Sequence, residues 1–228
     1  RGIIQDAPWL SPGPRKAIVA NGLDKNVRHG RIWRIRHVDH TPDKPPRMLE
    51  ESTVELLRHL GHDNGWWRNT AQKLIILRDD RKTVIPLLQG MARFSQNALA
   101  RLHALWTLEG LDNRDPALLL AAMEDTDSAV AAASIRILEP ILASGISKDF
   151  LPVLHRISKI GPIEVRRQLA LSLPYIPFEK VRETWISLLG SGASDAPLRS
   201  GAVSGLQGLE VALLETVSPH PDWQTPPP

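Results

Sequence analysis

The sequence contains no cysteine. This absence excludes disulfide bonds, cysteine-ligated zinc, thiol catalysis and covalent haem attachment within these 228 residues. Tyrosine and phenylalanine are scarce, with one and three residues, whereas tryptophan occurs seven times. No apolar run approaches the roughly 18 residues that a membrane-spanning helix requires, so the sequence predicts no membrane span.

The sequence also lacks the common motifs of catalysis. It has no glycine-rich phosphate loop, nucleophile elbow or zinc-protease pattern. His37 and His40 are three residues apart, as are His59 and His62, a spacing that can direct two imidazoles toward one metal ion. Neither pair has an obvious third ligand. We therefore expect no catalytic, cofactor-binding or metal-ligating residue, and we do not expect this chain to be an enzyme by itself.

Charge divides the chain into two parts. Residues 1–47 hold ten Lys and Arg against four Asp, whereas residues 48–228 hold eighteen Lys and Arg against twenty-one Asp and Glu. The change coincides with a segment rich in proline, which favours an extended path. Before it, residues 2–5 and 30–38 have the composition of strands. The predicted organisation is a β remnant over 1–40, a proline-rich linker over 41–47, a helical region over 48–217 and a proline-rich tail over 218–228.

The second predicted strand and the residues just before it are strongly basic. They include Arg28, Arg31, Trp33, Arg34 and Arg36. Such a strand could contact phosphates while its tryptophan stacks on a base. The basic outer face of a sheet whose other strands lie elsewhere explains the same pattern. We favour the sheet and predict no nucleic-acid partner.

A helical phrase recurs about every 33 residues in the second part of the chain. Its first members are separated by 33, 30, 36 and 32 residues, and a small residue follows each of them three positions later. The pairs are Arg68 with Ala71, Arg101 with Ala104, Ala131 with Ser134, Arg167 with Ala170, and Arg199 with Ala202. Each pair lies in the second of two predicted helices. This period predicts an all-α fold, a right-handed α-solenoid of about five helix pairs in which the small residues are close-packing positions.

The arginine of the phrase allows two interpretations. It could contact a ligand along one surface, or it could join neighbouring repeats by bonding an acidic residue in a nearby turn. Asp63 precedes Arg68 by five residues, and Asp125, Asp127 and Asp195 lie in comparable turns. We favour the structural ladder. Its predicted members are Asp63, Arg68, Arg101, Arg167 and Arg199, whereas Arg136 and Arg166 are the candidates for exposed, ligand-facing positions.

The dipeptide Trp66-Trp67 is the most unusual local feature of the helical region. Neighbouring residues on a helix point about 100° apart, so one ring should face the core and the other should point elsewhere. The second ring could pack on the preceding domain, which we favour, or form a site for a partner. Trp66 is therefore a candidate interaction residue.

Two stretches of the helical region resemble a known family. They are Asn64-Gly-Trp-Trp-Arg-Asn-Thr-Ala-Gln-Lys-Leu74 and Ala100-Arg-Leu-His-Ala-Leu-Trp-Thr-Leu-Glu-Gly-Leu111. They resemble signatures of large secreted proteins from planctomycetes and related bacteria, described as membrane-bound-dehydrogenase-like or haem-binding-domain proteins. Arg1-Gly-Ile-Ile-Gln5 and Gly30-Arg-Ile-Trp-Arg-Ile35 resemble the last propeller blade of the same proteins. The family joins a propeller similar to glucose/sorbosone dehydrogenases, a HEAT-repeat region and a C-terminal c-type cytochrome domain.

The resemblance implies that the helix pairs are HEAT-like. It also implies a non-catalytic scaffold and spacer in a larger periplasmic or exported protein, whose propeller and cytochrome domains are its partners. Haem c is expected in that parent protein and no cofactor in these residues, because they contain no Cys-x-x-Cys-His. Asp6 stands where the family is expected to have histidine, which puts any role of that position in doubt. Two alternatives stay open: a free-standing HEAT-type adaptor that binds another protein on its concave face, and a fragment of a sugar-dehydrogenase-like enzyme.

Overall fold

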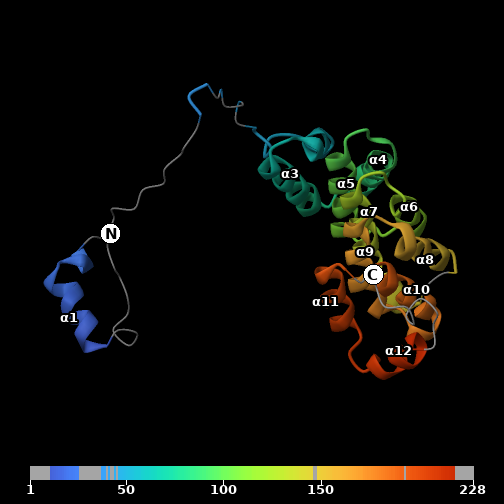
Figure 1. Ribbon diagram of the computed structural model, residues 1–228. Coiled ribbons are helices and arrows are strands. Elements are labelled where there is room, and N and C mark those ends of the chain that lie inside the picture. Colours follow the sequence, from blue (N-terminus) through green and yellow to red (C-terminus); the bar gives the residue numbers. More distant parts are fainter. Residues whose placement is uncertain are drawn as a thin grey trace. The chain divides into compact units, whose positions relative to one another are not determined.

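The computed structural model describes residues 11–25, 37–39, 41, 44, 46–145, 148–192 and 194–218 (Figure 1). The first predicted strand, residues 2–5, lies outside this set, as do residues 30–36 of the second. Val38, at the end of the second, lies in a turn. The chain divides into two compact units, Arg1–Pro45 and Pro46–Pro228, and the division falls within the proline-rich segment.

The described part of the first unit is one helix followed by a tight turn. Helix α1 (Pro12–Ala20) begins with a proline, which fits the first helical turn. The Asn21 side chain donates to the Ala17 carbonyl at 2.8 Å and closes the helix. Gly22 then adopts a left-handed conformation with φ of 64°, which glycine reaches without steric cost. The short 3-10 helix η2 (Leu23–Lys25) follows.

The second unit is helical throughout its described residues, which contain no strand, so the described fold is all-α as the sequence predicts. Its helices are α2 (Thr53–Leu56), α3 (Gly65–Arg78), α4 (Arg81–Phe94), α5 (Ala98–Gly110), α6 (Pro116–Ala122), α7 (Ser128–Ser144), α8 (Phe150–Ile160), α9 (Ile163–Ser172), α10 (Phe178–Ser191), α11 (Ala196–Gly205) and α12 (Glu210–Val217), with 3-10 segments η3 (Leu57–Gly61) and η4 (Leu173–Tyr175). None of the helices described here is long and apolar enough to cross a bilayer.

The helical region starts with a short α-helix. Helix α2 ends after one turn and continues as the 3-10 segment η3. Ser52 and Glu55 form a capping box that begins α2. At the other end the Asn97 side chain donates to the Gly61 carbonyl at 2.9 Å. The segment therefore ends in a tightened turn that is held by the next helix pair.

Side-chain caps fix where the second helix of most pairs begins. Asn64 accepts a hydrogen bond from the Trp66 amide at 2.9 Å, and Asp127 accepts from the amides of Ala129 and Val130. Asn97 and Asp195 cap α5 and α11 in the same way. Each cap satisfies backbone donors that the helix itself leaves free and is worth about 1 kcal/mol.

Most of the helices pack against the other helix of their pair, against the equivalent helix of a neighbouring pair, or against both. Within pairs, α4 contacts α5, α6 contacts α7 and α8 contacts α9. Between pairs, the second helices α3, α5, α7, α9 and α11 contact one another in chain order. The ribbon follows this order from α3 to α12 (Figure 1). The buried apolar residues form one continuous core along the whole unit.

The small residues of the repeated phrase lie at the centre of these contacts. Ala71, Ala104, Ser134, Ala170 and Ala202 each have zero exposed surface. Gly110 also lies at a close contact between second helices, because a Cβ atom added there would lie 2.4 Å from Cδ1 of Ile76 on α3. Short side chains therefore let successive second helices approach closely, as the sequence predicts.

Candidate functional site

The best-defined polar contact between repeats joins Arg101 and Asp125. Arg101 lies on α5, and Asp125 lies in the turn between α6 and α7 of the next pair. Arg101 Nε and Nη2 donate to the two carboxylate oxygens, both at 2.7 Å, while Nη1 donates to the Ser95 carbonyl at 2.8 Å. Burial raises the pKa of Asp125, but the hydrogen bonds from Arg101 and from the Asp127 amide outweigh burial, so that the net pKa is lowered.

A second bidentate pair repeats this arrangement two pairs later. Arg167 on α9 donates through Nε at 3.1 Å and Nη2 at 2.6 Å to the carboxylate of Asp195. Asp195 Oδ1 also accepts from the Leu198 amide at 2.8 Å and thereby caps α11. The Arg167 hydrogen bonds are the largest cause of the low pKa of Asp195, which is about 2. One carboxylate thus joins two repeats and begins a helix.

Arg68 uses different partners from those expected. It donates to the main-chain carbonyls of His62 at 2.6 Å and Asp63 at 2.8 Å. The prediction of an acidic partner was wrong in this respect, because Asp63 contributes its carbonyl. No carboxylate is available at the position equivalent to Asp125, since residues 92–95 read Ala-Arg-Phe-Ser. Arg199, the last predicted member of the ladder, is exposed on α11 and has an interaction of its own.

Arg68 also donates through Nε to Nε2 of His103, at 3.0 Å. Because a guanidinium can only donate, this contact requires Nε2 of His103 to be an acceptor. Nδ1 of His103 then carries the proton and donates to Oε1 of Gln72, at 2.8 Å. Burial and the charge of Arg68 lower the pKa of His103, which favours the neutral ring. His103 therefore joins α5 to two residues of α3, a role that the repeat pattern did not indicate.

The two tryptophans of α3 separate as predicted, one inward and one outward. Trp67 packs against the core and stacks on His62, with ring centroids 4.1 Å apart and an angle of 15°. His59 meets the same ring edge-on at 5.5 Å and bonds Oε2 of Glu51 at 2.7 Å. Trp66 remains 62% exposed. His59 and His62, one of the two histidine pairs that could have suggested a metal site, thus both contact Trp67.

The two arginines proposed as ligand-facing differ from each other. Arg136 on α7 is about half exposed and forms an ion pair with Glu139. Arg166 on α9 is only partly exposed and donates to Oγ of Ser191 on α10 at 2.9 Å. Ser191 in turn donates to the Ser158 carbonyl at 2.8 Å. Arg166 therefore joins neighbouring helix pairs. We expected an exposed, ligand-facing position, but the Arg166 side chain bonds the hydroxyl of Ser191.

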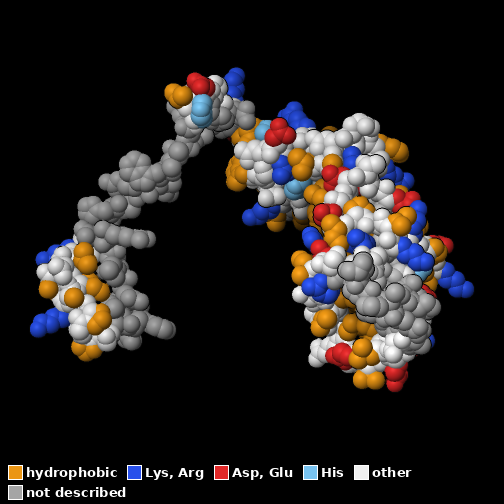
Figure 2. Space-filling view, viewed as in Figure 1, with side chains coloured by type: hydrophobic (Ala, Val, Ile, Leu, Met, Phe, Trp, Pro, Cys, Tyr) orange, Lys and Arg blue, Asp and Glu red, His pale blue; other side chains and the backbone are white. Residues whose placement is uncertain are grey.

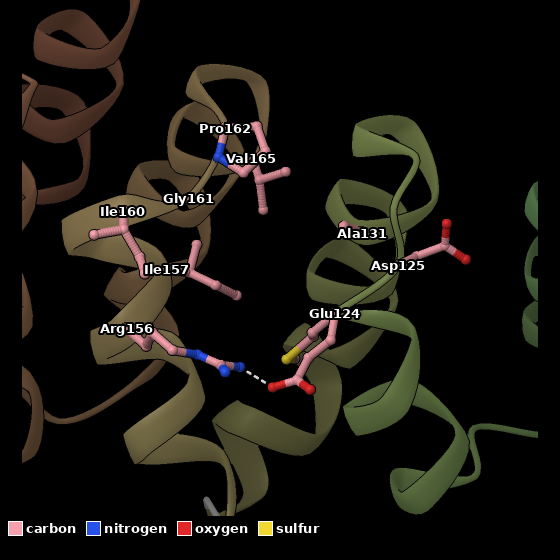
Figure 3. Close-up of a pocket in the computed structure, with 10 residues that line it drawn as sticks. Glu124, Asp125, Ala131, Arg156, Ile157, Ile160, Gly161, Pro162 and Val165 are labelled. Atoms are coloured by element: carbon pink, nitrogen blue, oxygen red, sulfur yellow. Dashed lines mark ion pairs between the residues drawn. The ribbon is translucent and has the colours of Figure 1, made fainter.

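A cleft of about 370 Å³ lies between the α6–α7 turn and the α8–α9 pair. Its floor is apolar and includes Ala131, Ile157 and Val165 (Figure 3). An ion pair between Glu124 and Arg156 crosses one side, as Figure 3 shows. This cleft can accept an apolar side chain but presents no nucleophile beside a base.

A second cavity, of about 260 Å³, lies between α5, α7 and η4. We call it the glutamate pocket, after its polar and aromatic lining residues Trp106, Glu109, Arg136, Glu139 and Tyr175. These residues are the fifth and eighth after the first member of the repeated phrase in three successive repeats. Equivalent positions of stacked helices therefore converge on one cavity. The sequence shows that these positions are equivalent in the repeat, but only the packing of the three helices shows that they line one pocket.

The exterior of the second unit is mixed in character. Acidic and basic side chains are interspersed over the face shown in Figure 2, with apolar side chains between them. The most exposed large apolar residues at the ends of first helices are Phe94, at 76%, and Ile160, at 79%. No group of three side chains able to hold a metal ion occurs among the residues placed by the structure.

Comparison with known proteins gives no match: no family model, no curated protein and no solved structure is similar to this sequence. The family resemblance inferred from sequence motifs therefore stays a prediction.

Proposed function

We propose that the second unit is a HEAT-like α-solenoid that serves as a non-catalytic scaffold. The observation that carries this proposal is the repeated link between second helices and the following turns. Arg101 with Asp125 and Arg167 with Asp195 make the same bidentate contact in different repeats. Bidentate pairing fixes orientation as well as distance, so that each pair of helices sets the position of the next.

The packing of small residues supports the same proposal. One helix pair leaves an apolar face exposed, and stacking a neighbour buries that face. Ala104 and Ala170 are fully buried at these contacts, which lets the second helices approach. A chain built in this way holds the segments at its two ends at a fixed separation. That is the property a spacer requires.

The motif resemblance suggests where such a spacer would act. In this proposal the unit separates a dehydrogenase-like propeller from a c-type cytochrome domain in an exported protein. Haem binding, electron transfer and any dehydrogenase chemistry would belong to those other domains. The motifs at residues 1–5, 30–35, 64–74 and 100–111 support this assignment.

The coding sequence on both sides of this chain tests the assignment. We expect an upstream propeller and a downstream Cys-x-x-Cys-His, and we expect the purified full-length protein to show the absorption spectrum of haem c. A start codon immediately before Arg1 and a stop codon after Pro228 would contradict the spacer and favour the adaptor. The adaptor is the second candidate because Phe94 and Ile160 expose apolar surface and Ile160 lines the cleft between α6 and α8.

A further inference from the structure

We propose that the glutamate pocket binds the guanidinium group of an arginine side chain presented by a partner protein. The pocket is formed by α5, α7 and η4 alone. The proposal is therefore independent of the scaffold assignment and of whatever domains flank the unit.

The volume and walls of the pocket suit one flat cationic side chain. Its 260 Å³ is below the roughly 300–1,000 Å³ of pockets that hold drug-sized ligands. Trp106 is partly exposed at the pocket, and Tyr175 is 44% exposed. Aromatic faces attract cations, and a planar guanidinium also stacks on them. Both rings are therefore available to a side chain that enters from outside.

Two of the three charged residues that line the pocket are glutamates, and the third is Arg136. Glu139 and Glu109 both line it, and a carboxylate can only accept hydrogen bonds when ionised. The Glu139 side chain is only 6% exposed. Because glutamate is rarely buried without a partner, its contacts need to be identified. Ser172 Oγ donates to its Oε1 at 2.7 Å, and Gln168 Nε2 lies 3.4 Å from the same oxygen. Both of these residues lie on α9, and their contacts hold the Glu139 carboxylate in place.

The second oxygen of Glu139 already receives a guanidinium, that of Arg136. The Arg136 side chain is 53% exposed and lies one helical turn away on the same helix. Because the Arg136 side chain is already about half exposed, water can solvate its guanidinium when it leaves the carboxylate. Arg136 can therefore swing into water when a competing guanidinium arrives. Its presence shows that this group fits against Glu139.

Arginine is favoured over lysine as the partner residue. Its guanidinium is planar and more weakly hydrated than an ammonium group, so it loses less on leaving water and can stack while it bonds a carboxylate. Glu109 Oε1 forms an ion pair with Nη2 of Arg114 at 2.7 Å. The Glu109 side chain is still 32% exposed, so its carboxylate can accept a second contact at the pocket. The occupant expected from this chemistry is an exposed arginine on a protein surface.

A peptide titration followed by NMR tests the proposal. The probe is acetyl-Gly-Arg-Gly-amide added to the ¹⁵N-labelled chain, and the readout is the indole resonance of Trp106, assigned with Trp106→Phe. We expect a saturable shift with the arginine peptide, a weaker one with the lysine peptide and none with the neutral citrulline peptide. An equal shift with citrulline, or no saturable shift, would overturn the proposal.

Variants separate binding from folding. Glu139→Gln should weaken the arginine peptide by roughly 10-fold or more, because a charge-assisted hydrogen bond is lost. Glu210→Gln, an exposed glutamate on α12, should leave affinity unchanged. Arg136→Gln should tighten binding by removing the competitor. If Glu139→Gln fails to fold, Tyr175→Leu at the half-exposed wall should weaken binding instead. Unchanged affinity in Tyr175→Leu, or weaker binding in Arg136→Gln, would contradict the proposed site.

Discussion

Arg101 and Asp125 lie 24 positions apart in sequence and form a bidentate ion pair with both N–O distances at 2.7 Å. Their side chains are only 12% and 11% exposed. The guanidinium also donates to the Ser95 carbonyl, and the carboxylate also accepts from the Asp127 amide. One contact therefore joins the turn before α5 to the turn before α7 and sets the spacing of two helix pairs.

Asp125→Asn should destabilise the chain by about 2 kcal/mol, because a partly buried guanidinium loses its charged partner. Urea unfolding followed by circular dichroism at neutral pH measures this loss. The matched control is Asp63→Asn, whose exposed carboxylate is not the group that Arg68 contacts. It should change stability by less than about 0.5 kcal/mol. Equal effects of the two substitutions would show that Asp125 has no special role.

The two tryptophans of α3 predict a second contrast. Trp67→Ala removes a ring that packs on the core and stacks on His62, and should cost about 2–3 kcal/mol. Trp66→Ala removes a ring that is 62% exposed and should cost less than about 0.5 kcal/mol. Thermal unfolding of both variants checks this. A larger loss for Trp66→Ala would mean that Trp66 is packed against another part of the chain.

Much of this arrangement could be predicted from the sequence, for local reasons. Asn64, Asp127 and Asp195 stand directly before helices and cap them, and such capping depends only on residues two or three positions away. The buried small residues followed from the period of the repeat. Both kinds of inference use spacing along the chain, which a sequence displays directly.

The contacts that could not be predicted from the sequence are those that depend on how the helix pairs stack. The side-chain partner of Arg68 is His103, 35 residues away, and residues 92–95 offer no carboxylate. The glutamate pocket requires three helices to bring equivalent positions together. A pattern of residues can indicate that two positions are equivalent. It does not give the distance between their side chains, which depends on how closely the helices approach.

Histidine protonation predicts a pH effect near neutrality. The pKa of His103 is lowered by burial and by Arg68, so that the folded chain holds this proton less tightly than the unfolded chain. Stability is then complete above the unfolded pKa of about 6.5 and decreases as pH falls below it toward the lower folded pKa. The urea concentration at the unfolding midpoint should decrease as the pH is lowered from 7.5 to 5.5. His103→Gln should reduce this pH dependence.

A part of this dependence should persist in His103→Gln. Burial also lowers the pKa of His155, aided by the charge of Lys159. Proton titration of the His103 ring by NMR separates the two histidines. A His103 pKa at or above 6.5 would contradict the assignment of Nε2 as the acceptor from Arg68.

Asp195 predicts a separate effect in acid. Its pKa is about 2 in the folded chain, against 3.8 for an unperturbed aspartate, chiefly because Arg167 donates to it. The stability that this difference supplies is complete above pH 3.8 and is lost as pH falls toward 2. Asp195→Asn should therefore unfold at a midpoint that changes less between pH 5 and 3 than that of the wild type. An identical acid dependence in the two proteins would show that the pair is not formed.

Hydrogen exchange on the same variant tests how stability is distributed along the unit. In a stack whose pairs contact only their neighbours, loss of one link should open the adjacent repeats first. Asp195 caps α11 and holds it to Arg167 of α9, and no cap closer to the C-terminal end of the described helices repeats this link. Asp195→Asn should therefore lower amide protection in α11 and α12, while protection in α3 and α5 stays within error of the wild type. Arg182→Gln, which removes an exposed ion pair with Glu179 on α10, serves as the control and should leave both ends unchanged. A uniform loss of protection from α3 to α12 would mean that the unit opens as a single cooperative block, which would contradict the local opening expected here.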